Sequence, residues 1–165
     1  MTEVDIYFEL LEEVHGVPPG WKKETIHLIW DVNIDFTWKA SWVLDGHKTP
    51  NPVVSTCAGV VSRGSVHIEF TYKVINRIEV LTSDIKNAYL QAPSSQKDYI
   101  IYETEFGIER IGRIALTQKA LYSGKSAGKD FRNHLRSCMK HLNLVSKLDE
   151  PDVWMRPAKH SNISD

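Results

Sequence analysis

The sequence lacks the features that usually mark a secreted or membrane protein. It contains two cysteines in 165 residues, Cys57 and Cys138, which suggest neither a disulfide framework nor a metal knuckle and favour a reduced compartment. Its first residues form neither a basic nor an apolar segment, so no signal peptide is visible. No apolar run approaches the roughly 18 residues that a membrane helix needs. We therefore expect an intracellular, cytoplasmic protein with no membrane partner.

Net charge is almost absent as well. The 20 Lys and Arg nearly balance the 21 Asp and Glu, so overall charge does not indicate a nucleic-acid binder. The distribution is uneven, because residues 1–15 are acidic with no Lys or Arg, whereas 125–148 are basic apart from Asp130. This asymmetry permits a basic surface on a nearly neutral chain, although a solvated helix face explains it equally well.

What is present is typical of a globular domain. The chain is 42% hydrophobic and 25% charged, and its length favours one domain with a substantial core. Residues 1–23 predict an acidic helix, with Ile6, Leu10, Leu11 and Val14 on one face, followed by a Pro/Gly linker. The folded domain is expected over 24–157, and the last residues, 158–165, as a disordered tail.

Several elements can be predicted within that domain. Residues 25–32 and 37–44 are rich in β-branched and aromatic residues and predict a hairpin. The apolar residues of 65–75 fit both the two-residue period of a strand and the spacing of a helix. Their strict alternation favours a strand, whereas Ser62 or Ser65 could cap a helix. Residues 78–85 predict a buried strand, and shorter strands are expected at 99–103 and within 111–121. The clearest helix covers 126–142 and carries a basic stripe of Lys129, Arg132, Arg136 and Lys140.

The segment that carries the most chemical information is 83–93, Ser-Asp-Ile-Lys-Asn-Ala-Tyr-Leu-Gln-Ala-Pro. Asp84 is placed at the end of the predicted apolar strand. Burying a carboxylate there costs free energy unless a cation or hydrogen bonds compensate for the lost hydration. A divalent metal is one such compensation, because Mg²⁺ takes one or two carboxylates together with substrate phosphates. An Asp at a strand end is more often a cap or an exposed edge residue.

The segment Asp84–Leu90 resembles the first catalytic motif of reverse transcriptases, Asp-x-x-x-Ala-aromatic-aliphatic, and especially its copia-type LTR-retrotransposon form. Other blocks follow in that family's order. Residues 39–46 resemble Lys-Ala-Arg-Leu-Val-Ala-x-Gly, 55–63 resemble Glu-Thr-Phe-Ala-Pro-Val, and 119–125 resemble Lys-Ala-Leu-Tyr-Gly-Leu-Lys. Residues 99–107 and 149–154 also match family blocks, so the resemblance covers about 24–157. It favours a helix for 65–75, which we adopt.

The resemblance implies an α+β fold, namely partial fingers and palm of a right-hand polymerase, with an antiparallel sheet packed against helices. It also implies RNA-directed DNA synthesis with Mg²⁺ as cofactor. Asp84 would be the first metal-binding carboxylate, the Ile85 backbone carbonyl a further ligand, Tyr89 the residue under the nucleotide sugar, and Lys39 a contact to the triphosphate. The partners implied are an RNA or DNA template-primer, a deoxynucleotide and the rest of a polyprotein.

Departures from the family pattern are equally informative. Ser41 stands where the family has Arg, and Trp38 stands at a position that is often basic in the family. Triphosphate binding should therefore be weaker. Five residues depart from the usual Gly-Leu-Lys-Gln-x-Pro-Arg stretch: Ser123, Gly124, Ser126, Gly128 and Lys129. The Tyr-x-Asp-Asp motif is missing, and no Asp-Asp pair occurs anywhere. We therefore expect a truncated fragment that does not polymerise alone; the alternative is a noncatalytic relic that binds nucleic acid through the basic stripe.

Other site patterns fit the sequence less well. Gly124-Lys125-Ser126 lacks the glycine that a phosphate-binding loop needs at position 119, which is Lys. A zinc site formed by Cys57, His134, Cys138 and His141 would lack paired ligand spacing. A Cys-His hydrolase stays open, although no nucleophile elbow is present.

Overall fold

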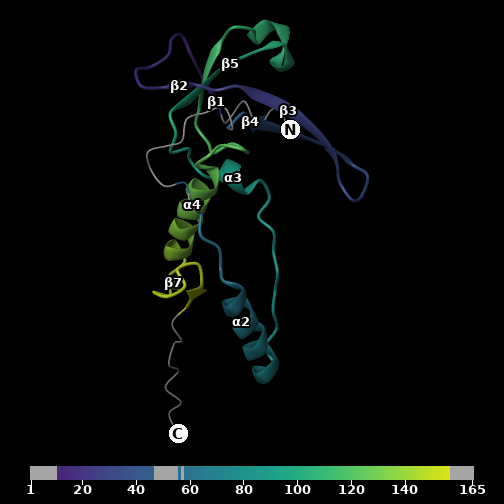
Figure 1. The fold of residues 1–165 in the computed structure, drawn as a ribbon, viewed down its shortest axis with the longest axis vertical. Helices are drawn as coiled ribbons and strands as arrows, with labels where there is room; N and C mark the ends of the chain where they lie inside the picture. The colour runs from purple at the N-terminus through teal and green to yellow at the C-terminus, as the bar shows by residue number, and fades with distance from the viewer. Residues whose placement is uncertain (1–10, 47–55, 57, 157–165) are drawn as a thin grey trace. The chain divides into compact units, whose positions relative to one another are not determined.

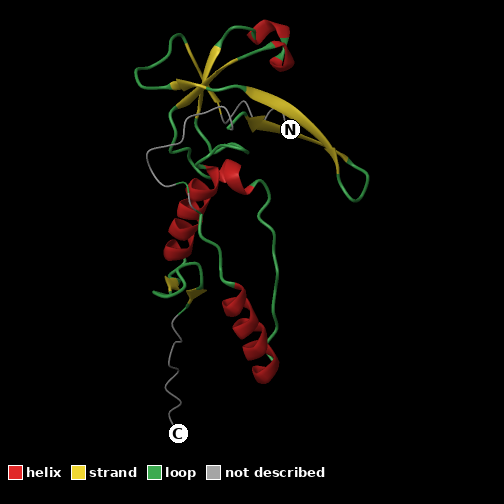
Figure 2. Cartoon of the chain, viewed as in Figure 1, coloured by secondary structure: helices red, strands yellow, loops and turns green. Residues whose placement is uncertain are grey.

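The computed structural model describes residues 11–46, 56 and 58–156. The chain forms two compact units, each made of two separate stretches. Unit 1 comprises Met1–Cys57 and Asn87–Phe131, and unit 2 comprises Ala58–Lys86 and Arg132–Asp165. The predicted folded region 24–157 therefore contributes to both units. Its class is α+β, as the sequence predicted (Figure 2).

Unit 1 is built on a four-stranded sheet with the order β1-β6-β5-β2 (Figure 1). Its strands are β1 (Leu11–Val14), β2 (Lys22–Lys23), β5 (Asp98–Ile101) and β6 (Ile114–Thr117). β6 pairs antiparallel with both β1 and β5, whereas β2 pairs parallel with β5. The short strands predicted around 99–103 and within 111–121 are confirmed as β5 and β6.

The predicted hairpin is also confirmed, as β3 (Ile26–Val32) and β4 (Trp38–Leu44). Its antiparallel register runs from the pair Ile26–Leu44 to the pair Val32–Trp38. The turn closes where the Asn33 amide donates to the Thr37 carbonyl at 2.9 Å. Asp35 braces the turn by accepting a 2.7 Å hydrogen bond from the Thr37 hydroxyl, which fits the local bonding typical of Asp in turns.

The core of unit 1 lies where the base of the hairpin meets the four-stranded sheet. Trp42 of β4 stacks on Phe106 with ring centroids 4.3 Å apart. Phe106 belongs to the short helix η1 (Thr104–Phe106), which precedes a second one, η2 (Ile108–Arg110). The buried cluster consists of Trp42, Leu44, Leu90, Ile100, Tyr102, Phe106, Ala115 and Leu121. Apolar burial of this kind is the main favourable contribution to folding.

Two further helices belong wholly or partly to unit 1. The one-turn helix α3 (Ala88–Gln91) follows Asn87, whose φ of 52° is left-handed. The helix α4 (Ala127–His141) confirms the prediction over 126–142. Its first turn is tied by Asp130, whose carboxylate accepts hydrogen bonds from the Ser126 hydroxyl at 2.9 Å and from the Ser95 amide at 3.0 Å.

Unit 2 contains α2 (Arg63–Asn76), the last residues of α4, and a small ribbon of β7 (Val145–Ser146) and β8 (Trp154–Met155). α2 confirms the helix adopted for 65–75, and Ser62 is its N-cap, accepting a hydrogen bond from the Ser65 amide. The buried apolar residues of the described chain all fall in unit 1. Within its described residues, unit 2 therefore has no apolar core.

Two predictions were wrong. Leu11–Val14 form a strand instead of the end of an acidic helix, because their backbone pairs with β6 from Leu11–Thr117 to Val14–Ile114. Residues 78–85 are irregular and exposed instead of a buried strand. The rest of the predicted N-terminal helix and the predicted tail lie outside the described residues.

In the part of the chain that the structure describes, no helix has the length and apolar character required to cross a membrane.

Candidate functional site

Asp84 lies in the irregular, exposed segment that leads to α3. Its carboxylate is therefore not buried at a strand end, and the desolvation argument for a compensating cation does not apply to it. Ile85, whose carbonyl was the other expected metal ligand, is partly exposed in the same segment. Among the described residues, no group of three or more His, Cys, Asp or Glu side chains could hold a metal. The residues described do not complete a magnesium site.

Tyr89 lies in unit 1 within an aromatic cluster. Its ring meets Tyr122 edge-on at 5.4 Å between centroids and Phe131 of α4 at 6.0 Å. Tyr89 and Phe131 pack against three buried residues of the same cluster, Ala92, Ala120 and Ala127. Edge-to-face contacts of this type hold a ring in place by more than its buried area alone. Tyr89 is thus half-buried and fixed between α3 and the first turns of α4.

Lys39 is exposed on β4, directly across the ribbon from Asp31 of β3. The neighbouring positions, Trp38 and Ser41, are those at which the family has basic residues. Trp38 is exposed and pairs in register with Val32. Lys39 is the one Lys or Arg between residues 26 and 44.

Two of the family-like blocks, 39–46 and 119–125, meet in unit 1 although about 80 residues separate them. The Leu44 amide donates to the Tyr122 carbonyl at 3.0 Å, and Val43 and Tyr122 form a parallel bridge. A Cβ added at Gly46 would overlap the Ser123 backbone carbonyl. Ser123 itself has a φ of +63°, the left-handed region in which glycine is favoured. Both glycines of the family pattern, at 46 and 123, therefore correspond to positions with a backbone reason for glycine.

The stretch 91–93, directly after the Asp84–Leu90 motif, joins the same meeting point, whereas Asp84 itself belongs to unit 2. The Ala120 amide donates to the Ala92 carbonyl at 3.0 Å, and Pro93 forms an antiparallel bridge with Lys119. The Lys119 ammonium donates to the Gln91 carbonyl at 3.2 Å. Three stretches that are distant in sequence thus share one network of backbone contacts in unit 1.

The predicted basic stripe lies on α4, but its members differ in what they contact. Arg132 grips Asp152 with two nitrogens, Nε at 2.9 Å from Oδ1 and Nη2 at 2.8 Å from Oδ2. This bidentate geometry is a strong form of ion pair, so Arg132 is already engaged within unit 2. Lys129 and Arg136 are half-buried and Lys140 is exposed. Three cations remain available on the helix.

Sequence reasoning did not identify a group of buried carboxylates in unit 1. Glu24, Asp45 and Asp98 are each less than one-tenth exposed, and they come from the ends of different strands. Burial raises the pKa of Glu24, and the charge of Asp98 raises it further. Burial also raises the pKa of Asp98, which Lys22 partly opposes. Asp45 accepts a hydrogen bond from the Thr25 hydroxyl at 2.7 Å and pairs with His27 at 2.8 Å.

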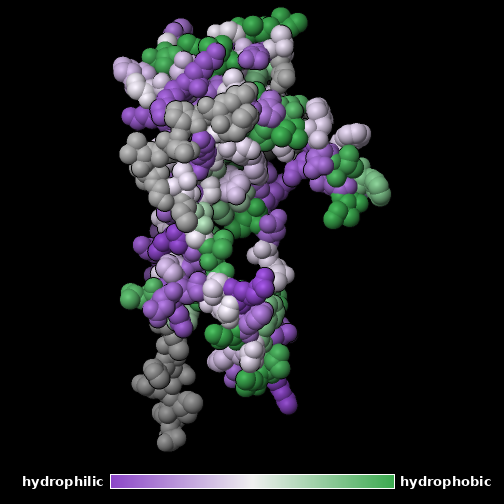
Figure 3. Space-filling view, in the orientation of Figure 1, coloured by the Kyte–Doolittle hydropathy of each residue, from purple (hydrophilic) through white to green (hydrophobic). Residues whose placement is uncertain are grey.

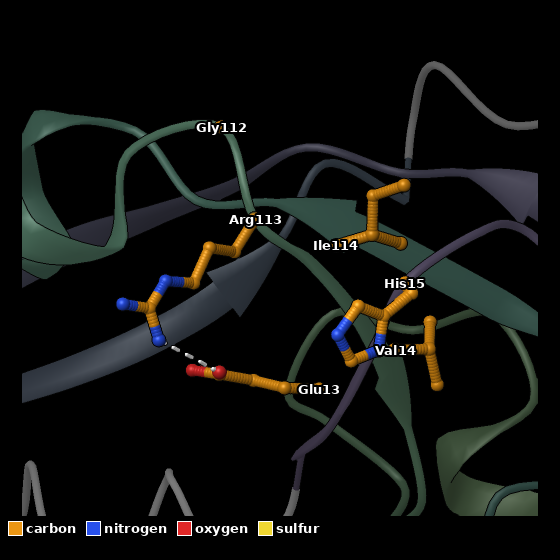
Figure 4. A pocket seen from close by; sticks show the side chains of 6 residues that line it. All are labelled: Glu13, Val14, His15, Gly112, Arg113 and Ile114. Carbon is orange, nitrogen blue, oxygen red and sulfur yellow. Dashed lines mark hydrogen bonds and ion pairs between the residues drawn. The ribbon is translucent and has the colours of Figure 1, made fainter.

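Two pockets are lined by described residues, one in each unit. In unit 1, a pocket of about 470 Å³ is lined by Glu13, His15, Arg113 and their neighbours (Figure 4). Arg110 and Arg113 each donate to the Glu13 carboxylate at 3.2 Å, so the carboxylate and the guanidinium that line this pocket are paired with each other. In unit 2, a pocket of about 420 Å³ lies between α2 and the β7–β8 ribbon and has a mainly apolar lining. Neither pocket contains a residue of the predicted catalytic set.

The two cysteines do not complete an alternative site in the described chain. Cys138 is an exposed free thiol, 3.8 Å from the His134 ring, and Cys57 lies outside the described residues.

Comparison with known proteins adds no relative: no family model, no curated protein and no solved structure matches this chain.

Proposed function

We propose that the chain is a segment of a copia-type retrotransposon reverse transcriptase, comprising part of its fingers and palm. The parent reaction is nucleotidyl transfer, in which a primer 3′-hydroxyl attacks the α-phosphate of a deoxynucleotide. In that enzyme the segment contributes Asp84 and the Ile85 carbonyl to the metal site. Lys39 and Tyr89 serve the triphosphate and the sugar of the nucleotide.

The observation that carries this proposal is the convergence of the family-like blocks in unit 1. A chance set of short matches has no reason to meet in space. Here the blocks 39–46 and 119–125 join each other, and the residues directly after the Asp84–Leu90 motif join 119–125, through backbone hydrogen bonds and bridges. The glycine positions of the pattern coincide with a close backbone approach at Gly46 and a left-handed φ at Ser123. The helix α2 also agrees with the family pattern where periodicity alone favoured a strand.

The same proposal accounts for what this chain lacks. Unit 2 has no buried apolar residue among its described residues, as a piece of a larger palm would. One carboxylate cannot hold a metal pair, whose ions lie about 3.5–4 Å apart in such sites. We therefore expect no primer extension by this chain alone, since it has no Asp-Asp pair.

A chimeric polymerase tests the assignment. Residues 24–157 replace the equivalent segment of an active copia-type reverse transcriptase, and primer extension is measured on an RNA template with Mg²⁺. Because Trp38 and Ser41 weaken the triphosphate contact, a second chimera carries Trp38→Lys and Ser41→Arg. We expect extension by the second chimera at least, and a loss of about a thousandfold with Asp84→Asn, as removal of a catalytic electrostatic group typically causes.

The matched control is Asp149→Asn, which neutralises another exposed carboxylate of unit 2. It should leave extension within about twofold, the scale of a surface substitution. If both chimeras fail, or if Asp84→Asn extends primers as well as Asp149→Asn does, the segment is not a polymerase palm.

A second candidate function is nucleic-acid binding without catalysis, and the three available cations of α4 favour it. Lys129, Arg136 and Lys140 are spaced by seven and four residues, which places them along one side of the helix. With three phosphates contacted, the slope of log K against log salt should be about −2 on single strands. Replacing the three by Gln should abolish binding, whereas Arg63→Gln with Lys73→Gln on α2 should not. Salt-independent binding would exclude this function.

A further inference from the structure

The β3–β4 hairpin has one apolar face, and among the described residues the core of unit 1 covers that face only at its base. Side chains on alternate positions share a side of a ribbon. Ile26, Leu28, Trp42 and Leu44 lie on this side and pack in the core of unit 1. Further along the same side come Trp30, Val32 and Trp38, and Ile34 and Phe36 follow in the turn. The apolar pattern therefore continues beyond the part of the face that the core covers.

The outer part of this face is strongly exposed. Trp30 is 64% exposed, Trp38 76%, Phe36 87% and Ile34 100%, and Val32 is nearly half exposed. In Figure 3, which is coloured by hydropathy, hydrophobic residues (green) gather beside paler and hydrophilic ones at the free end of the hairpin. An isolated two-stranded ribbon is marginally stable in water, so covering this face would stabilise the hairpin as well as remove apolar surface from water.

We infer that the exposed face of the hairpin, formed by Trp30, Val32, Ile34, Phe36 and Trp38, is a self-association surface that packs against the same face of a second copy of this chain. This inference does not depend on the polymerase assignment. Two such ribbons meet face to face as a small sandwich, related by a twofold axis.

The size of the face fits this occupant. Aromatic side chains bury about 150–250 Å² each, so the exposed parts of three rings with Ile34 and Val32 amount to roughly 600–700 Å² on each copy. A symmetric pair would then bury about 1,200–1,400 Å² in total, at the lower limit of a specific, stable interface. The dimer should therefore form reversibly in the micromolar range. Trp and Phe in the centre are the residue types that most often dominate binding.

The charges around the face argue against a phosphate or an anionic lipid surface as the partner. Residues 26–44 carry Lys39 as the one Lys or Arg, against Asp31 and Asp35. Hydrogen bonds from the Thr37 hydroxyl and amide hold the pKa of Asp35 below its usual range, so the turn stays anionic at neutral pH. Nucleic acids and anionic membranes attract basic surfaces instead. An apolar face that carries no charged side chain is complementary to its own copy.

Sedimentation equilibrium of the full chain, over roughly 1–100 μM, tests the inference in the concentration range expected for an interface of this size. A monomer–dimer equilibrium should be seen, and tryptophan emission should shift to shorter wavelength as the dimer forms and the rings leave water. Trp30→Thr with Trp38→Thr keeps strand-forming residues at both exposed positions. This variant should weaken dimerisation by about tenfold or more.

The matched control is Phe70→Gln with Tyr72→Gln, which removes two exposed aromatic rings from α2 in unit 2. It should leave the dimerisation constant within about twofold. A monomeric wild-type chain at every concentration would overturn the inference whether or not the variants fold. An equal loss of association in the control variant would also overturn it. So would binding of the monomer to zwitterionic vesicles or to single-stranded oligonucleotides, if the hairpin variant abolished that binding.

Discussion

At the scale of single residues, Gly46 marks a point where two backbones approach so closely that no side chain fits. The added methyl of Gly46→Ala would overlap the Ser123 carbonyl, which is backbone and cannot move aside cheaply. We expect a loss of about 1–3 kcal/mol in the free energy of unfolding, as for overpacking in general. Urea denaturation measures it. Gly16→Ala is the control, because nothing lies within 4 Å of that Cβ, and it should be neutral or slightly stabilising.

At Ser123, on the other side of the same backbone contact, we expect a substitution to stabilise the protein. Its left-handed φ of +63° costs a residue with a Cβ about 1–2 kcal/mol, a cost that glycine avoids. Ser123→Gly should therefore raise the unfolding free energy by about 0.5–1 kcal/mol once the higher entropy of unfolded glycine is counted. Ser137→Gly, an exposed substitution of the same kind inside α4, should lower it by a similar amount. Thermal denaturation of both variants would contradict the prediction if their shifts had the same sign.

At the scale of elements, α2 depends on its capping contacts because none of its residues is buried. The Ser62 hydroxyl accepts a hydrogen bond from the Ser65 amide at 3.0 Å, and the Ser62 amide and Ser65 hydroxyl donate to the Glu150 carboxylate. Ser62→Ala should destabilise the helix by about 1 kcal/mol, the usual cost of losing a cap. Amide hydrogen exchange over residues 63–76 should become about fivefold faster. Ser83→Ala, at an exposed irregular position, should leave that exchange unchanged.

The elements that could be predicted are those whose signal is local. The hairpin combines β-branched strands with a turn braced by the Asp35 side chain, and α4 has a long amphipathic period. The elements that could not be predicted depend on distant partners. Leu11–Val14 have a helical apolar period, but pairing with β6 decides their conformation. Residues 78–85 have the composition of a buried strand, yet a strand forms only where a neighbouring strand accepts its hydrogen bonds, and the described residues offer none.

The same distinction applies to the candidate site. Asp84 and Tyr89 could be singled out because a short motif contains both, and Tyr89 is indeed held by aromatic neighbours. The environment of Asp84 was predicted wrongly, since its expected burial rested on a strand over 78–85 that does not form. Glu24, Asp45 and Asp98 could not be found at all, because isolated acids in three segments become a cluster only through the pairing of β2 with β5 and of β3 with β4.

At the scale of the whole molecule, the two units should respond to acid in opposite directions. In unit 1, burial raises the pKa values of Glu24 and Asp98 above those of the unfolded chain. The folded state then binds these protons more tightly, so their contribution favours unit 1 at low pH and is lost as pH rises through the folded pKa values. In unit 2, hydrogen bonds from Ser65 and Ser62 lower the pKa of Glu150. That contribution is present above the unfolded pKa and is lost as pH falls through the folded one.

Hydrogen exchange corrected for the intrinsic rate, followed from roughly pH 7 to pH 3, separates the two effects because it reports each segment independently. Protection of β2 and β5 should rise on acidification, whereas protection of the first turn of α2 should fall. Glu24→Gln with Asp98→Asn should remove the rise in unit 1, because neither amide can release a proton. Glu79→Gln, at an exposed position of unit 2, should leave both responses intact. If both units lost protection together, acid would be acting through general charge repulsion, and the buried carboxylates would not control the stability of unit 1.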